Sequence, residues 1–284
     1  MRADLHLHTN ASDGQYSPAE LVALARDFDV IAITDHDTTK GIAEAQQAAK
    51  QQGAPIVIPG IELSAEDDDG DVHILGYYVN VEDTAFQETL TRLRASRYYR
   101  GQQILDRLAA MNMPLDWERV VAIAEGGAIG RPHIARALVA AGYVESVKEA
   151  FTLYIGNGGP AYVARARLSP EQSVELIHEA GGAAVLAHPG LLFDRRAMIM
   201  RLLAVGLDGV EVAHPSNSQD VRLDLRGIAI ANRLVMTGGS DFHGPQVKPN
   251  TQMGMVTPPE GAVDALRRAA QRYNSVTPPD NPET

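Results

Sequence analysis

Short apolar segments rich in β-branched residues alternate with helical segments along most of this 284-residue chain. Strands that alternate with helices predict a parallel sheet. About seven such strands favour a closed (β/α) barrel over an open sheet. The expected strands lie in ADLHLHT, VIAITDHD, PIVIPGIELSA, DVHILGYYV, AAVLAHP, DGVEVAHP and LVMTGGSDFHG.

A segment with a different sequence pattern interrupts this alternation of strands and helices. After a long helical stretch at about 84–111, residues 114–168 combine short helical patterns with glycine-rich turns and contain no strand of the barrel kind. We therefore expect residues 1–113 and 169–284 to form the barrel, and residues 114–168 to form a small inserted helical domain.

Composition limits the chemistry that the chain can carry. The sequence has no cysteine and a formal net charge of −11. Without cysteine, any metal must bind imidazole and carboxylate ligands, and the composition agrees with a reducing cytoplasm. The negative charge argues against binding of long DNA, which depends on Lys and Arg. No apolar run approaches the roughly 20 residues that span a bilayer, and we recognise no signal peptide.

Histidines and carboxylates occur at the ends of the expected strands. His6 and His8 are two positions apart on the first strand, so their side chains point to the same face. The strand ends of a (β/α) barrel surround its active-site mouth, so residues far apart in the sequence meet there. The residues in this position are His6, His8, Asp13, His36, Glu62, His73, His188, Asp241 and His243.

These side chains provide enough imidazole and carboxylate groups for two or three divalent ions. The alternative is a set of unrelated buried or surface histidines. Such a set would not coincide with the strand ends, and six of the nine histidines of the chain follow the pattern. The sequence therefore predicts a metal centre of more than one ion.

The motifs HLHTNASDG, TDHD, GIELSA followed by VHILGY, LAHPG and SDFH resemble, in this order, those of the PHP (polymerase and histidinol phosphatase) domain family. The pieces GRPHIARALV and GNGGPAYV make the chain similar to one branch of that family. This branch includes phosphatases of nucleoside 3′,5′-bisphosphates and enzymes that trim short 5′-phosphorylated RNA.

The resemblance implies a distorted (β/α)7 barrel with three divalent ions, for which Mn²⁺ is favoured and Fe²⁺ or Zn²⁺ are alternatives. It implies that His6, His8, Glu62 and Asp241 bind the first ion. Glu62 would bridge to a second ion held by His73 and His188. The third ion would be held by Asp13, His36 and His243.

The implied activity is hydrolysis of the 3′-phosphate of a nucleoside 3′,5′-bisphosphate, such as adenosine 3′,5′-bisphosphate, by attack of a metal-bridging hydroxide. His214, which ends DGVEVAHP, is a candidate proton donor to the leaving group. A strand-end histidine that only bonds a neighbouring loop is the alternative.

The 5′-phosphate of such a substrate needs a second docking point. Pro132 suits the first turn of a helix, which would place Arg131 and His133 at a helix N-terminus that favours anions. Asn157 and Arg165 are candidates to complete this pocket, with ordinary solvated loop residues as the alternative.

Other functions remain open at this point. Trimming of short 5′-phosphorylated RNA is the closest alternative to the phosphatase. Amidohydrolase barrels also begin with an HxH motif, and a metal-binding module without catalytic activity is a further possibility. The sequence does not reveal the metal, the base preference or the oligomeric state.

Overall fold

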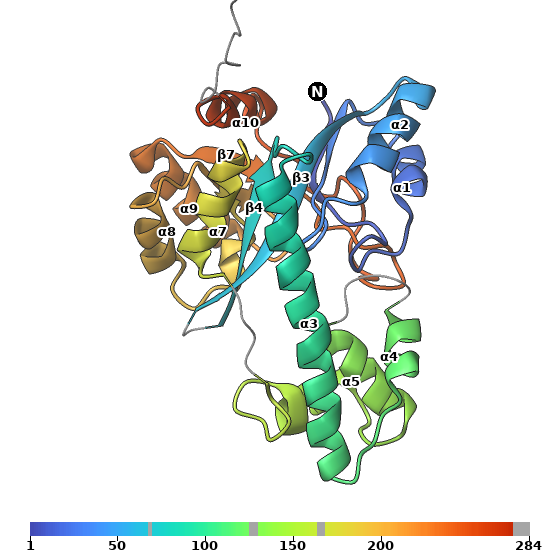
Figure 1. Ribbon diagram of the computed structural model, residues 1–284. Helices are drawn as coiled ribbons and strands as arrows, with labels where there is room; N and C mark the ends of the chain where they lie inside the picture. The colour runs from blue at the N-terminus through green and yellow to red at the C-terminus, as the bar shows by residue number, and fades with distance from the viewer. Residues whose placement is uncertain (68–69, 125–129, 164–167, 275–284) are drawn as a thin grey trace, which may run out of the picture. The chain divides into compact units, whose positions relative to one another are not determined.

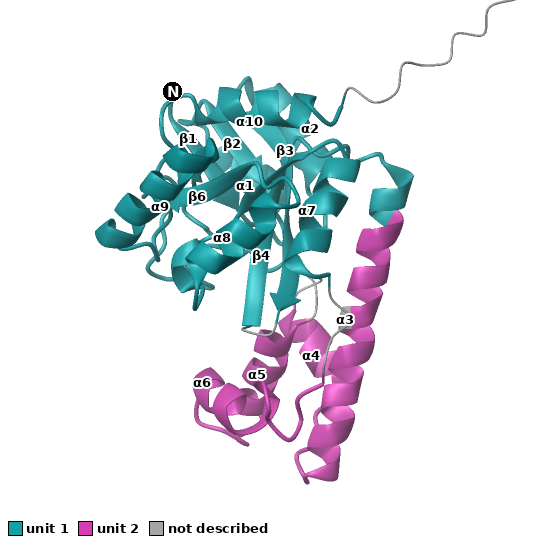
Figure 2. Cartoon of the chain, turned by 90° about the vertical axis from the view of Figure 1, so that its left-hand side faces the viewer, with its two compact units in different colours: residues 1–87, 168–284 teal, residues 88–167 magenta. Residues whose placement is uncertain are grey.

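The computed structural model describes residues 1–67, 70–124, 130–163 and 168–274 (Figure 1). The chain forms two compact units, residues 1–87 with 168–284 and residues 88–167 (Figure 2). Residues 88–113 belong to the second unit, whereas the sequence pattern assigned them to the barrel. These residues belong to the second unit because Ile104 and Leu108 pack with apolar side chains of the insertion.

Seven strands form one sheet in chain order, from β1 to β7. The pairs β1–β2, β2–β3, β5–β6 and β6–β7 are parallel, and the two pairs that include β4 are antiparallel. The strands are β1 (Ala3–Leu7), β2 (Val30–Ile33), β3 (Ile56–Asp67), β4 (Gly70–Tyr77), β5 (Ala183–Leu186), β6 (Gly209–Ala213) and β7 (Val235–Gly238).

The first and last strands approach each other and nearly close the sheet into a barrel. Leu7, at the end of β1, forms a parallel bridge with Phe242, which follows β7. The His8 N–H donates a hydrogen bond to the Phe242 carbonyl oxygen at 3.0 Å. The expected distorted (β/α)7 barrel is thereby confirmed.

The direction of β4 differs from the parallel arrangement that the alternation of strands and helices predicts. β3 ends at Asp67 and β4 begins at Gly70. A parallel connection needs a crossover of about a dozen residues or more, so two strands this close in the sequence must pair antiparallel. His73 therefore reaches the rim from the first half of β4, not from its C-terminal end. Glu62 likewise lies in the middle of the long strand β3, and does not close it.

The barrel strands bury apolar side chains on both sides. On β2, Val30 and Ala32 pack in one cluster with Leu266, whereas Ile31 and Ile33 pack in another with Leu21. This arrangement explains the continuous apolar runs of the parallel strands. The helices of this unit are α1 (Pro18–Leu24), α2 (Ile42–Gln52), α7 (Pro170–Glu179), η2 (Pro189–Leu191), α8 (Arg195–Leu203), α9 (Gln219–Asn232) and α10 (Ala262–Gln271).

In the second unit, the described residues 88–124 and 130–163 form helices joined by turns and contain no strand. Leu105, Val120, Leu138 and Ile155 belong to its apolar core. Its helices are α3 (Thr84–Ala110), which begins in the barrel unit, α4 (Trp117–Ile123), α5 (Arg131–Ala140), α6 (Val147–Ala150) and η1 (Phe151–Ile155). None of the helices described in the chain is long and apolar enough to cross a membrane.

Candidate metal centre

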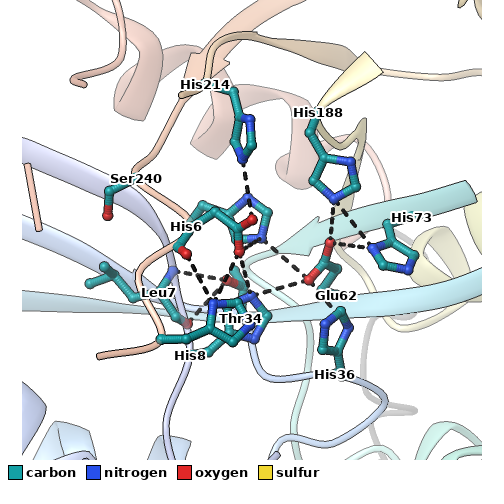
Figure 3. Close-up of polar contacts among 12 residues, drawn as sticks. His6, Leu7, His8, Thr34, His36, Glu62, His73, His188, His214 and Ser240 are labelled. Carbon is teal, nitrogen blue, oxygen red and sulfur yellow. Dashed lines mark hydrogen bonds and ion pairs between the residues drawn. The ribbon is translucent and has the colours of Figure 1, made fainter. Parts of the chain in front are cut away.

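The nine side chains predicted from the strand ends meet at one rim of the barrel unit. Figure 3 shows His6, His8, His36, Glu62, His73 and His188 among them. They come from β1, β3 and β4 and from the segments that follow β1, β2, β5 and β7. The structure thus brings together His6, His8, Asp13, His36, Glu62, His73, His188, Asp241 and His243.

Glu62 lies in the middle of these imidazoles (Figure 3). Its Oε1 is 2.9 Å from His73 Nδ1 and 3.0 Å from His188 Nε2. Its Oε2 lies 3.1 to 3.3 Å from nitrogens of three further histidines, His6, His8 and His36. Burial raises the pKa of the Glu62 carboxyl, but the surrounding imidazoles outweigh it and hold that pKa well below its usual range.

Asp241 completes the group around His6 and His8. Its Oδ1 lies 3.7 Å from His6 Nε2 and 3.4 Å from His8 Nε2, so both imidazoles face Asp241 as well as Glu62. Lys248 contacts the other oxygen, with Nζ 2.6 Å from Asp241 Oδ2. The ammonium group stabilises the charged form of this carboxylate.

Asp13 lies at the centre of a second group of histidines. Its Oδ1 is 3.6 Å from His8 Nδ1 and 3.3 Å from His243 Nε2, and its Oδ2 is 3.8 Å from His36 Nε2. Four groups of described side chains offer ligand atoms within 4.8 Å of one another, which suits a bound ion. These groups are His8, Asp13, His36 and His243; His6, His8 and Asp241; His6, Glu211 and His214; and His36, Glu62 and His73.

Several polar atoms of the cluster are buried without a hydrogen-bond partner among the residues that the structure describes. They are His6 Nε2, both ring nitrogens of His8, Glu62 Oε2 and His188 Nδ1. Leaving such atoms unpaired in a protein interior is costly, and they are normally satisfied. Imidazole nitrogens and carboxylate oxygens are the donor set of Mn²⁺, Fe²⁺ and Zn²⁺, so divalent ions fit these residues.

Burial and charge set the protonation of this cluster. Burial lowers the pKa of His36 to about 3, despite the nearby Glu62 and Asp13 carboxylates. For His8, burial also acts downward, but Asp241 and Glu62 outweigh it and raise the pKa to about 9. A metal binds the neutral imidazole, so an ion that binds His8 displaces a proton.

Two residues of the cluster occupy left-handed backbone conformations. φ is 28° at His188 and 54° at Asp241. Such values are strained for residues with a side chain and concentrate at functional sites. Gly239 directly follows β7, and a Cβ atom at this position would collide with the backbone of His6 on β1. Glycine at this position therefore allows the ends of β1 and β7 to come together.

Glu211 belongs to this site, and sequence reasoning missed it. It lies on β6 and is fully buried, with Oε1 2.9 Å from His6 Nδ1. Its other oxygen accepts a hydrogen bond from the His188 N–H at 2.8 Å. A carboxylate on one ring nitrogen fixes the histidine so that the other nitrogen can bind a metal. The signal in the sequence was a lone glutamate between the valines of VEVA.

His214 lies next to the cluster, with Nε2 3.3 Å from Asp241 Oδ2. Its Nδ1 accepts a hydrogen bond from the Ser216 N–H at 3.1 Å. In the neutral imidazole, the proton must therefore sit on Nε2, the nitrogen that faces Asp241.

The structure also joins two of the predicted phosphate-docking residues in the helical unit. Arg131 begins α5, and its guanidinium donates a hydrogen bond to Asn157 Oδ1 at 3.0 Å. The same guanidinium lies 5.6 Å from the ring centre of Phe151 and 5.7 Å from that of Tyr162. The helix start thus presents a cation held by an amide and two aromatic rings.

The other two docking candidates differ from this pair. His133 is buried in the first turn of α5, where its Nδ1 accepts a hydrogen bond from the Gly130 N–H at 3.0 Å. This contact shapes the helix start. Arg165 lies outside the described residues.

Comparison with known proteins gives the following similarities. A family model described as "PHP domain" matches residues 4–154. A 5′-3′ exoribonuclease Rnm from Salmonella typhimurium is 36% identical over 250 residues, which cover 85% of each chain. A 3′,5′-nucleoside bisphosphate phosphatase from Chromobacterium violaceum is 37% identical over 252 residues, covering 85% of this chain and 87% of that protein.

A solved structure of a Bifidobacterium adolescentis protein, inferred to be a metal-dependent phosphoesterase, superposes with a TM-score of 0.82 at 33% identity. The match covers 94% of this chain and 96% of that chain. The similarity therefore extends over the whole fold.

Proposed function

The chain belongs to the PHP domain family and is a metal-dependent phosphoesterase, and from that premise we propose that it removes the 3′-phosphate of nucleoside 3′,5′-bisphosphates. The observation that carries the proposal is the Glu62 carboxylate, which has five imidazoles within 3.3 Å. The bisphosphate phosphatase with 37% identity supports the choice of substrate.

In this proposal the cluster holds three ions, with Mn²⁺ favoured. His6, His8, Glu62 and Asp241 hold the first ion, Glu62 with His73 and His188 the second, and Asp13 with His36 and His243 the third. The contacts of Glu62 with His73 and His188 at 2.9 and 3.0 Å support its bridging role. Bound divalent ions would generate a nucleophile from water at neutral pH and neutralise charge on the phosphoryl oxygens.

The residues around the ions orient the cluster and handle protons. Glu211 fixes the ring of His6 and the backbone of His188. As a general acid, His214 would act with both ring nitrogens protonated, Nδ1–H donating to Ser216 Oγ. It would give its Nε2 proton, beside Asp241, to the ribose 3′-oxygen as the phosphate leaves, and the ring would be left neutral.

Arg131, with Asn157, binds the 5′-phosphate in this proposal. Arginine offers planar donors that match phosphate oxygens, and the start of α5 adds partial positive charge. His133 contributes by shaping that turn, and Arg165 is a further candidate.

Trimming of short 5′-phosphorylated RNA is the second candidate function, favoured by the exoribonuclease with 36% identity. The same ions and the same 5′-phosphate site would serve, and a phosphodiester would replace the 3′-monoester. The net charge of −11 argues against long nucleic acid as a substrate.

Phosphate release by Mn²⁺-loaded protein tests the proposal. The substrates are adenosine 3′,5′-bisphosphate, 3′-AMP, 5′-AMP and a short 5′-phosphorylated RNA. Rapid conversion of the bisphosphate to 5′-AMP, with slow turnover of 3′-AMP, is the expected result. Mononucleotide release from the RNA with little bisphosphate turnover would replace the phosphatase with the exoribonuclease. No turnover of any of the four would exclude both.

A further inference from the structure

Two large apolar side chains are exposed directly after a residue of the metal cluster. Leu191 is 64% exposed and Phe193 is 91% exposed, and both follow His188 by no more than five positions. Single exposed apolar residues are ordinary, but neighbouring ones beside a polar centre mark a binding surface.

These side chains line a cavity of about 330 Å³ together with two residues of the cluster. His73 and His188 form part of its wall, and Leu191, Phe193 and Met198 form another part. Pockets for small ligands have volumes of roughly 300–1,000 Å³, so the cavity is large enough for a nucleobase.

The cavity adjoins the candidate metal cluster, because the two histidines in its wall also contact Glu62 Oε1. A group bound there would therefore adjoin the reacting phosphate.

The charge around the cavity indicates which part of a nucleotide it accepts. Asp67, Asp71 and Asp194 line the same space, and the Arg201 guanidinium is 3.1 Å from the Asp67 carboxylate. Carboxylates repel a phosphate but accept hydrogen bonds from the amino and ring N–H groups of a base. An apolar surface with acidic neighbours suits the base better than either phosphate.

The segment that carries Phe193 is anchored on both sides. Asn217, which is buried, accepts a hydrogen bond from the Gly190 N–H at 3.1 Å and donates to the Glu211 and Val212 carbonyl oxygens. On the other side, the Asp194 carboxylate accepts from the Ala197 N–H at 2.9 Å and begins α8. An anchored surface loses little conformational freedom when a ligand binds.

We propose that Phe193 and Leu191 form a platform on which the base of the nucleotide substrate stacks while its 3′-phosphate lies at the metal centre. The assignment of the ligand as a nucleotide rests on the proposed function, and the platform adds a specificity-determining surface to it. Stacking of a base on an aromatic side chain tolerates any base, since every base has a π face.

Kinetics with and without the base test the platform. Phe193→Ala is expected to raise KM for adenosine 3′,5′-bisphosphate about tenfold, equal to about 1.4 kcal/mol, and to leave kcat within about twofold. For 1-deoxyribose 3,5-bisphosphate, which has no base, KM should not change. Leu223→Ala, at an exposed position on α9, is the control. Equal losses on both substrates, or a change of oligomeric state in Phe193→Ala, would overturn the platform.

A binding measurement separates the platform from the proposed reaction. The fluorescence of Phe193→Trp should be quenched saturably by 5′-AMP and not by ribose 5-phosphate, above the signal of the single native Trp117 in the wild type. Leu223→Trp should respond to neither compound. Quenching without bisphosphate turnover would keep the platform and reject the phosphatase. Turnover without quenching would keep the phosphatase and reject the platform.

Discussion

The barrel unit and the helical unit hold their candidate functional residues in different ways. Glu62 is 1% exposed and its carboxylate contacts five imidazoles, several of which have buried nitrogens that suit a metal. Arg131 is half-buried and is steadied by Asn157 and two aromatic rings. The first region is a dense network in which each member depends on several others. The second is a local docking point, so its loss should affect only the substrates that use it.

The largest effect is expected from a substitution that disrupts the metal cluster of the barrel unit. Asp13→Ala removes the carboxylate that contacts His8, His36 and His243. Loss of a group that merely supports a metal ligand costs roughly 10–100-fold, so loss of a ligand should lower kcat on every substrate by on the order of 10³-fold. Steady-state kinetics and metal content by mass spectrometry measure the effect. A variant that keeps wild-type turnover would contradict the assignment of the third ion, and an unchanged circular dichroism spectrum is the control for folding.

Metal removal should destabilise the barrel unit and leave the stability of the helical unit unchanged. Ions that bind only the folded barrel stabilise it by about 3 kcal/mol when present at about a hundred times their dissociation constant. Chelation followed by Mn²⁺ addition should therefore increase hydrogen-exchange protection around His6, Glu62 and His188, with no change in α5. Exchange measured by mass spectrometry gives both values in one experiment. Equal changes in hydrogen-exchange protection in both units would show that the metal does not stabilise the barrel unit alone.

A smaller effect is expected at the support of the cluster. Glu211→Gln keeps the size of the side chain but weakens its hydrogen bond to His6, so metal affinity and kcat should fall by about 10–100-fold. Titration calorimetry with the metal ion measures the affinity. The matched control is Glu175→Gln, on the exposed face of α7. A fall in stability with unchanged metal affinity would assign Glu211 to the core alone.

The smallest effect should be selective. Arg131→Ala should raise KM for a substrate with a 5′-phosphate by about tenfold, because it removes hydrogen bonds to a charged group. Hydrolysis of p-nitrophenyl phosphate should not change. Arg136→Ala, exposed on the same helix, is the control. Equal losses on both substrates would remove Arg131 from phosphate recognition and erase the contrast between the units.

The sequence predicted the barrel from strand periodicity and most of the cluster from the strand ends, although Glu62 and His73 reach the rim from within β3 and β4. His6 and His8 share one face of a strand, and strand ends share one rim whatever the details of packing. The direction of β4 depends on a short connection that the alternation rule does not consider. Glu211 was missed because it contacts His6 through tertiary structure, across more than two hundred residues. Long-range partners of this kind leave little trace in one sequence.

The bridge between Leu7 and Phe242 has a consequence for how the protein is made. It joins the segment that carries His6 and His8 to the one that carries Asp241 and His243. During translation the first pair leaves the ribosome long before the second pair. A nascent or prematurely terminated chain therefore lacks two residues of the cluster. The hydrolase should therefore become active only after His243 has been synthesised, and chains that end before this residue should be inactive.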